Sequence, residues 1–318
     1  MAEGMEVSEA LAHCQGAISR GSKSFTLAAR LFPPRLRDAA ALVYGWCRHC
    51  DDEIDGHANE GAARLGERVA RLRSQTVEVL GGGKGSVPEF VAFGHVARLY
   101  RIPEHYPLEL IEGMAMDARQ QRYETLGDLE HYCYRVAGTV GLMMTHAMGL
   151  TDPAALRNAC DLGIAMQLTN ISRDVIEDAA LGRVYLPLEW LKQAGIEPER
   201  LAAERAGVAE VVARLLARAD EKYRSGRAGL RSLPLSSAFA IAAAARVYAA
   251  IGTRVRVRGA RAWDTRTVVS PARKALAVFR ALVDVAVTVP GRLVSPRSVV
   301  PITPVSYTHL RAHETKAN

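Results

Sequence analysis

The chain has 318 residues, of which 49% are hydrophobic and 24% charged, and its formal net charge is +7. This composition excludes a disordered chain, because enough apolar side chains are present to offset the entropy cost of ordering. The five cysteines form no regular framework, which argues against a disulfide-stapled secreted fold and favours a reducing cytoplasm. The basic excess is moderate and scattered, with no zinc-finger or RNP-type motif, so we expect no nucleic-acid partner.

Prolines and glycines divide the chain into helix-length segments whose apolar residues lie three and four positions apart. Alanine is abundant, aromatic residues make up only 6%, and no hairpin has a strand-like period. Thr125 and Asp128 have the spacing of a capping box. Asp152 followed by Pro153 is typical of an N-cap and a first helical position. The sequence therefore predicts an all-α, single-domain bundle with short loops.

Two segments invite other interpretations. The run GGGKGS at residues 81–86 lacks the serine or threonine that a P-loop needs directly after its Gly-Lys, so it is predicted to be a flexible linker. The segment from Ser236 to Gly252 is about one helix long, but it is rich in alanine and interrupted by Arg246. It is predicted to be a buried helix rather than a membrane span, with contact to a membrane surface left open.

A first acidic motif ends the segment AALVYGWCRHCDDEID at residues 40–55. Read as a helix, this segment has one apolar stripe, and beside the stripe lies a polar line spaced four, three and four residues: Tyr44, Arg48, Asp51 and Asp55. Asp51 and Asp55 are one turn apart, so their carboxylates can bind a common ion, whereas Asp52 points about 100° away from Asp51. The CxxC of this segment has no second pair, so its cysteines are interpreted as buried helix residues.

A second polar line follows in the segment from Met166 to Pro187, with the members Gln167, Asn170, Asp174 and Asp178. In this composition about three or four acidic pairs four residues apart arise by chance, and they mostly mark solvated faces. Two pairs beside apolar stripes, each with amide, tyrosine or arginine partners, favour a site. The hard oxygen donors suit Mg²⁺ or Mn²⁺ better than zinc. Such ions could hold a diphosphate and stabilise it as a leaving group.

At these residues the sequence resembles the squalene and phytoene synthase family of head-to-head trans-prenyltransferases. Its motifs occur in the family's order. GSKSF at 21–25 resembles an N-terminal substrate-contact segment, and YCYRVAGTVG at 132–141 resembles a pocket helix. Between and after them come the two DxxxD motifs, the second followed by GRVYLP. The segment RAWDTRTVVSPARK at 261–274 is similar to the basic C-terminal segment of bacterial members of the family.

The resemblance implies an all-α isoprenoid-synthase fold with a central hydrophobic cavity. It also implies a Mg²⁺-dependent transferase of prenyl groups in carotenoid biosynthesis. Two molecules of geranylgeranyl diphosphate would condense head to head, through prephytoene diphosphate, to 15-cis-phytoene with release of diphosphate. No reductant is used in that reaction, so no NADPH is expected.

Three alternatives stay open. A dehydrosqualene or squalene-type synthase acting on farnesyl diphosphate would share every metal residue, because the closed end of the channel decides chain length. A non-catalytic scaffold on the same fold would be expected to lose the metal aspartates, and all four are present. A cyclising terpene synthase usually pairs one aspartate-rich motif with an asparagine-serine type motif.

Residue roles follow from the resemblance, position by position. The metal would be bound by Asp51, Asp55, Asn170, Asp174 and Asp178, and the catalytic set comprises the four aspartates with Arg48 and Tyr44. The diphosphates would be contacted by Ser22, Lys23, Ser24, Arg48, Tyr132, Gln167 and Asn170. The prenyl pocket would be lined by Phe25, Val136, Ala137, Gly138, Gly141 and Leu142. Two further basic residues are interpreted as phosphate neighbours or surface charges, namely Arg273 and Lys274.

We expect residues 1–290 to form the synthase domain and 291–304 a proline-rich tail. Residues 305–318, VSYTHLRAHETKAN, resemble a translated sequencing adapter and are interpreted as non-native. Because the implied substrate and product are lipids, we expect a cytoplasmic protein that associates peripherally with the membrane. The basic C-terminal half would favour anionic headgroups. The sequence does not indicate an oligomeric state.

Overall fold

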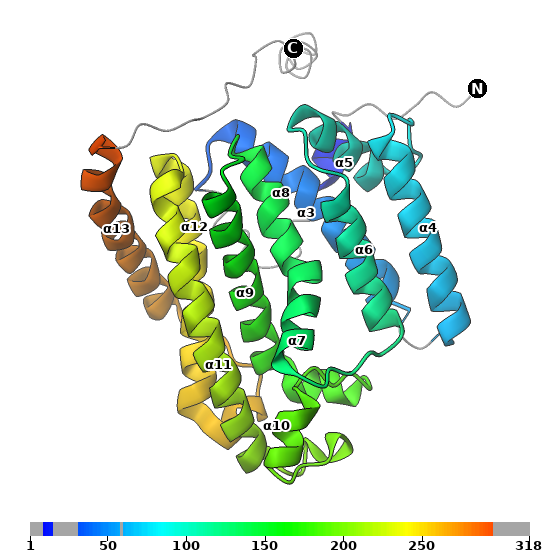
Figure 1. Ribbon diagram of the computed structural model, residues 1–318, viewed down its shortest axis with the longest axis vertical. Coiled ribbons are helices and arrows are strands. Elements are labelled where there is room, and N and C mark those ends of the chain that lie inside the picture. The colour runs from blue at the N-terminus through cyan, green and yellow to red at the C-terminus, as the bar shows by residue number, and fades with distance from the viewer. Residues whose placement is uncertain (1–8, 15–30, 58–59, 295–318) are drawn as a thin grey trace.

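The computed structural model describes residues 9–14, 31–57 and 60–294. Within these ranges every regular element is a helix, and the long helices lie side by side in an elongated bundle (Figure 1). The predicted all-α architecture is therefore confirmed. Helix α13 lies at one edge of the bundle and helix α4 at the other, with α9 between them.

The elements follow one another along the chain with short connections. The α-helices are α3 (Pro34–Asp55), α4 (Ala62–Leu80), α5 (Pro88–Leu99), α6 (His105–Ala118), α7 (Leu126–Cys133), α8 (Thr139–Ala147), α9 (Pro153–Ala180), α10 (Leu188–Gln193), α11 (Arg205–Ala228), α12 (Leu235–Arg258) and α13 (Pro271–Val294). The π-helical and 3₁₀ segments are η1 (Tyr134–Gly138), η2 (Pro198–Arg200), η3 (Gly229–Ser232) and η4 (Gly259–Trp263). Helix α13 continues past residue 290, so the first four residues of the expected tail are helical.

Both predicted helix starts are present. The hydroxyl of Thr125 accepts the backbone N–H of Asp128, whose carboxylate accepts the backbone N–H of Thr125, which completes the capping box. The carboxylate of Asp152 accepts the N–H of Ala155 at 2.8 Å and caps α9. The glycine-rich run at 81–86 connects α4 to α5, as predicted.

Two hydrophobic clusters surround the central helices. One joins α3, α5, α6 and α8, and at its centre Trp46 stacks on Phe93 with ring centroids 4.0 Å apart. The other packs α9 against α11 and the segment that follows α9. Helix α9 contacts α8, α11, α12 and η1, so its side chains are held in fixed positions at the centre of the bundle.

Helix α12 is the apolar segment around Arg246. Leu235–Trp263 is the described stretch that is long and apolar enough to cross a membrane, and 56% of its most apolar window is buried within the protein. It packs against α9, α11 and α13. The arginine that interrupts it pairs with Asp284 of α13 at 2.5 Å. The prediction of a buried helix is confirmed for α12.

The expected pocket helix at residues 132–141 is not one continuous α-helix. The π-helical segment η1 lies between α7 and α8 and widens the turn there. It lies so close to α9 that a Cβ atom on Gly163 would stand 2.3 Å from the carbonyl oxygen of Ala137. Only glycine fits at this crossing, and the close contact holds η1 against α9.

We predict that Gly163→Ala destabilises the protein by about 1–3 kcal/mol, because two backbones would have to separate. Gly66→Ala in α4 is the matched control, since a Cβ atom at this position would have no atom within 4 Å. That change should stabilise the protein by about 0.5–1 kcal/mol through helix propensity. Chemical denaturation measures both values. Equal effects of the two substitutions would contradict the close contact.

Candidate active site

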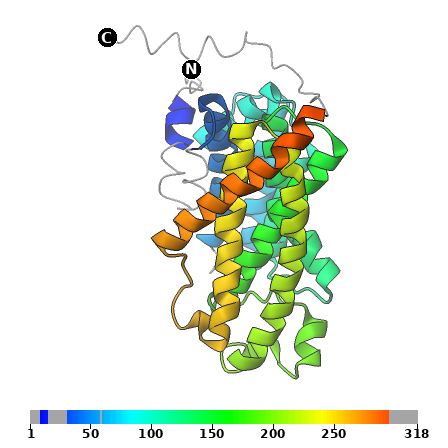
Figure 2. The same ribbon diagram turned by 90° about the vertical axis from the view of Figure 1, so that its left-hand side faces the viewer.

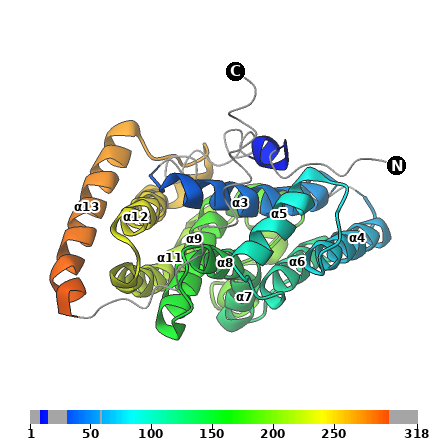
Figure 3. The ribbon, with the colours of Figure 1, turned by 90° about the horizontal axis from the view of Figure 1, so that it is seen from above.

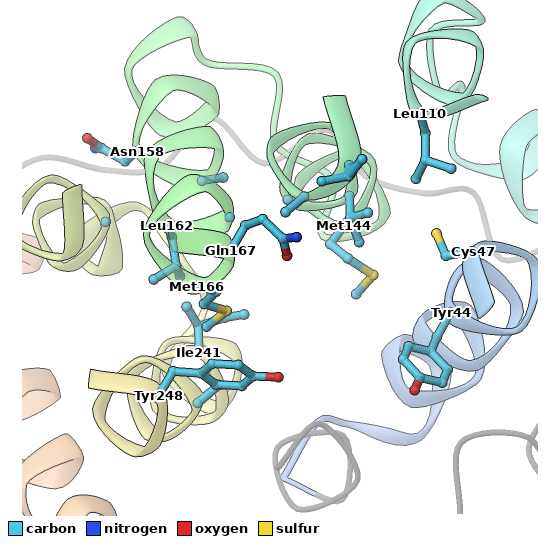
Figure 4. A pocket seen from close by; sticks show the side chains of 18 of the residues that line it. Tyr44, Cys47, Leu110, Met144, Asn158, Leu162, Met166, Gln167, Ile241 and Tyr248 are labelled. Atoms are coloured by element: carbon cyan, nitrogen blue, oxygen red, sulfur yellow. The ribbon is translucent and has the colours of Figure 1, made fainter. Parts of the chain in front are cut away.

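A cavity of about 350 Å³ lies at the centre of the bundle. Its wall includes a stripe along α9 from Ala155 to Asn170, a rise of about 22 Å. Figure 4 shows Tyr44 and Cys47 of α3 across the cavity from Met166 and Gln167 of α9. Most of the lining side chains are aliphatic or methionine, so the cavity is a long apolar channel. Most of its polar groups gather at one end, and Asn158 lies near the other.

The structure brings five of the predicted polar residues to one end of this channel: Tyr44, Arg48, Asp51, Gln167 and Asn170. Three of the predicted prenyl-pocket residues also line it, namely Val136, Ala137 and Gly141. Gly138 instead faces the sulfur of Cys160, and Leu142 is buried in the core, so neither is a lining residue. The expected contacts at 22–25 (Ser22, Lys23, Ser24, Phe25) lie outside the described residues.

The first acidic motif is held by two arginines. Arg48 pairs with Asp51 at 3.0 Å and with Asp52 at 2.5 Å. Asp55 pairs with Arg183 at 2.6 Å, and Arg183 comes from the connection that follows α9. The guanidinium of Arg183 therefore links the end of the first motif to the segment that carries the second.

The second acidic motif lies near the carboxyl end of α9. Asp174 pairs with Arg173, and also with Arg266 at 3.5 Å. The segment that carries Arg266 is anchored on α9, because the indole N–H of Trp263 donates to the carbonyl oxygen of Ser172 at 3.2 Å. The sequence had indicated Arg273 and Lys274 of this basic segment as phosphate neighbours or surface charges. Both lie in the first turn of α13, and Arg266 is the cation beside the motif.

A further carboxylate, which sequence reasoning missed, lies between the two motifs. Asp117 at the end of α6 accepts hydrogen bonds from the hydroxyls of Tyr132 at 2.8 Å and Tyr185 at 2.7 Å. Burial is the largest cause that raises the pKa of Asp51 and Asp178, and the charge of Asp117 adds a smaller contribution to both. Tyr132 is thus placed in a buried polar cluster rather than on the cavity wall. Asp117 belongs to no spaced motif, so no signal in the sequence marks it.

The carboxylates raise one another's pKa values. Burial, and then the charge of Asp55, raise the pKa of Asp51 to about 7, although Arg48 opposes the shift. Burial and then Asp174 raise the pKa of Asp178 to about 7, against the effect of Arg183. Burial is also the main cause that raises the pKa of Asp117 to about 6. The site carries more negative charge than its arginines offset, which favours binding of a cation.

The donor set fits a hard divalent cation. The side-chain oxygen of Asn170 is buried and has no hydrogen-bond partner among the described residues, so it is free to act as a ligand. Across the described ranges, no group of three or more histidine, cysteine or acidic side chains converges on one point. Mg²⁺ suits this arrangement, because it takes one or two carboxylates and completes its shell with phosphate oxygens and water.

We predict that the metal-free protein loses stability as the pH rises from 5 to 8. The pKa of Asp178 is about 7 in the folded chain, above its ordinary value of 3.8, so the folded state binds the extra proton and loses that advantage as the carboxyl ionises. For this partly exposed group the loss is about 1–2 kcal/mol. Mg²⁺ should then raise the melting temperature more at pH 8 than at pH 5.

Thermal melts of Asp178→Asn test the assignment, since the variant should show a flatter pH dependence and a smaller effect of Mg²⁺. Asp220→Asn on α11 is the control, because that side chain is 49% exposed and pairs with Arg256 away from the site. A Mg²⁺ effect that is independent of pH, or unchanged in Asp178→Asn, would overturn the prediction.

Comparisons with known proteins agree with this geometry. The sequence is 47% identical over 272 residues to the phytoene synthase of Pseudescherichia vulneris, covering 83% of this chain and 88% of that protein. It is 44% identical over 286 residues to the 15-cis-phytoene synthase of Enterobacter agglomerans, covering 87% and 96%. It is 46% identical to the 15-cis-phytoene synthase of Paracoccus sp., covering 81% and 86%.

Solved structures show the same architecture. A dehydrosqualene synthase in complex with ligand superposes with a TM-score of 0.81 at 29% identity, covering 88% of this chain and 98% of that one. The squalene synthase of Alicyclobacillus acidocaldarius gives a TM-score of 0.72 at 26% identity, covering 80% and 95%. The predicted isoprenoid-synthase fold is thereby confirmed. The profile of the squalene/phytoene synthase family matches residues 18–274, and the chain belongs to this family.

Proposed function

We propose that this protein is a 15-cis-phytoene synthase that condenses two molecules of geranylgeranyl diphosphate head to head. One observation carries the proposal: a long apolar channel has Arg48 and Asp51 of the first motif on its wall, across from α9, the helix that also carries the second motif. A prenyl diphosphate has the matching chemistry, a hydrocarbon tail and an anionic head. Four bacterial phytoene synthases are 44–47% identical to this chain, whereas the dehydrosqualene synthase is 29% identical.

The proposed metal is Mg²⁺ or Mn²⁺, with Asp51, Asp55, Asn170, Asp174 and Asp178 as its ligands. Bound there, the ions would supply the positive charge that stabilises diphosphate as a leaving group. Arg48 lies on the cavity wall and can donate charge-assisted hydrogen bonds to a phosphate. Gln167 and Asn170 add amide donors one turn apart on α9. These groups fix the head of each substrate at the polar end of the channel.

The reaction proposed has two steps at this one end. One diphosphate leaves its allylic carbon, the double bond of the second molecule captures the cation, and loss of one proton closes the cyclopropane of prephytoene diphosphate. The diphosphate of that intermediate then leaves, and rearrangement with loss of one proton gives phytoene. Both steps form a carbocation that water would capture, so the apolar lining protects it by excluding water. No hydride is added, so no NADPH is required.

The first experiment is a product assay with Mg²⁺ and without NADPH. We expect a C40 hydrocarbon from geranylgeranyl diphosphate, identified by mass spectrometry. Asp51→Ala and Asp174→Ala should each lower its formation by about 100-fold or more, because charge stabilisation at the leaving group is lost. Asp220→Ala on α11 should retain activity. A C30 product from farnesyl diphosphate alone would identify a dehydrosqualene-type enzyme, and no product from either substrate would favour the scaffold.

Chain length provides a second prediction. Ala155 lines the channel at the end remote from the aspartates, since the stripe on α9 runs from there to Asn170. Ala155→Leu should shorten the channel and lower kcat/KM for geranylgeranyl diphosphate by about tenfold or more relative to farnesyl diphosphate. Ala154→Leu, one residue away and not on the wall, is the matched control. An equal loss of kcat/KM for both substrates would contradict the prediction that this end of the channel limits chain length.

A further inference from the structure

Helix α13 forms the outermost layer of the bundle beside α12. It crosses α12 diagonally in Figure 2, and in Figure 3 it stands at the edge of the molecule farthest from α4. Its inner face is made of small side chains, since Ala277, Ala281 and Val285 are the buried ones. The larger side chains of the helix are therefore not used to hold it against the bundle.

The larger apolar side chains of α13 face outward. Six of the eleven exposed large hydrophobic residues in the described ranges lie on this one helix: Leu276, Phe279, Leu282, Val283, Val287 and Val289. Phe279 is 62% exposed and Val287 is 75% exposed. At 100° per residue the six fall within one sector of about 160°, together with alanines and no charged residue. A surface helix normally turns its large apolar side chains inward, whereas α13 turns them outward. This sector, the outer face of α13, is an exposed apolar patch.

The charges beside the outer face are positive. Arg273 and Arg280 are exposed along one flank of the sector, and neither pairs with an acid among the described residues. Between 271 and 289 the helix has one acid, Asp284, which is 16% exposed and already pairs with Arg246. An apolar strip with a basic flank and no free acid complements a surface that is apolar inside and anionic outside.

We propose that the outer face of α13 docks the protein on an anionic lipid bilayer, with its apolar strip lying in the interface and Arg273 and Arg280 at the headgroups. A second copy of the chain fits the face less well. A two-fold axis near the middle of the helix would bring Arg280 of each copy within about one turn of the other, without an acid to offset them. The role of docking in catalysis rests on the proposed function, because a membrane supplies prenyl lipids and takes up the hydrocarbon product. The docking itself is measured without substrate.

Flotation of the full chain with vesicles tests the proposal. The protein should float with phosphatidylcholine vesicles that contain phosphatidylglycerol, and less with pure phosphatidylcholine or at high salt. Phe279→Ser combined with Val283→Ser should weaken binding by about tenfold or more. Arg280→Gln should weaken binding to the anionic vesicles alone. Val77→Ser on α4 is the matched control, since that valine is 51% exposed on a different helix.

The alternatives are distinguished in the same samples. Activity on detergent-dispersed substrate and the melting temperature should be unchanged in the variants, which separates lost docking from lost folding or lost catalysis. If the wild type does not float, or if the double variant floats like the wild type, the proposal is wrong. If the double variant instead converts a dimer to a monomer by light scattering without changing flotation, the face belongs to a second copy and the proposal is also wrong.

Discussion

Buried negative charge is the constraint on which the rest of this structure depends. Asp51, Asp117 and Asp178 come from three helices, and burial raises the pKa of all three. The charge of Asp117 raises the pKa of the other two further. The fold holds them together with arginines placed at their edges rather than among them, as in the pair of Arg183 with Asp55. Such an arrangement costs stability in the free protein, and bound cations would offset that cost.

Helix α9 connects that charge to the channel. Its carboxyl end carries Asp174 and Asp178, while the preceding turns present small and apolar side chains to the cavity. Gly163 allows η1 to approach α9 at backbone distance, so the π-helical segment forms the neighbouring part of the wall. One helix thus supplies both the acidic end and the hydrocarbon wall, which fixes the distance between the two in a single rigid element.

The sequence predicted what depends on spacing within one helix. The capping box at Thr125 follows from a local residue pattern and the buried character of α12 from its composition, and the structure has both. Of the two polar lines predicted from helical spacing, the structure places Tyr44, Arg48, Asp51, Gln167 and Asn170 on the cavity wall. The sequence did not predict what depends on packing between segments. Asp117 and Arg266 belong to no spaced motif in the sequence. Asp117 reaches the site from the end of α6, and Arg266 reaches it from the segment before α13. The π-helical segment likewise arises from close packing on α9, which no local pattern encodes.

Helices α12 and α13, both apolar, show that the hydropathy of a helix does not determine whether it is buried. Helix α12 has the stronger membrane-like composition, yet most of its apolar window is covered by neighbours. Helix α13 has small residues where it meets α12 and large ones where it meets solvent. The pair of Arg246 with Asp284 fixes which side of α13 turns inward, because it removes the one acid of the helix from the surface. A single ion pair therefore leaves the outer face both apolar and free of negative charge, a property that arises only once the two helices have packed together.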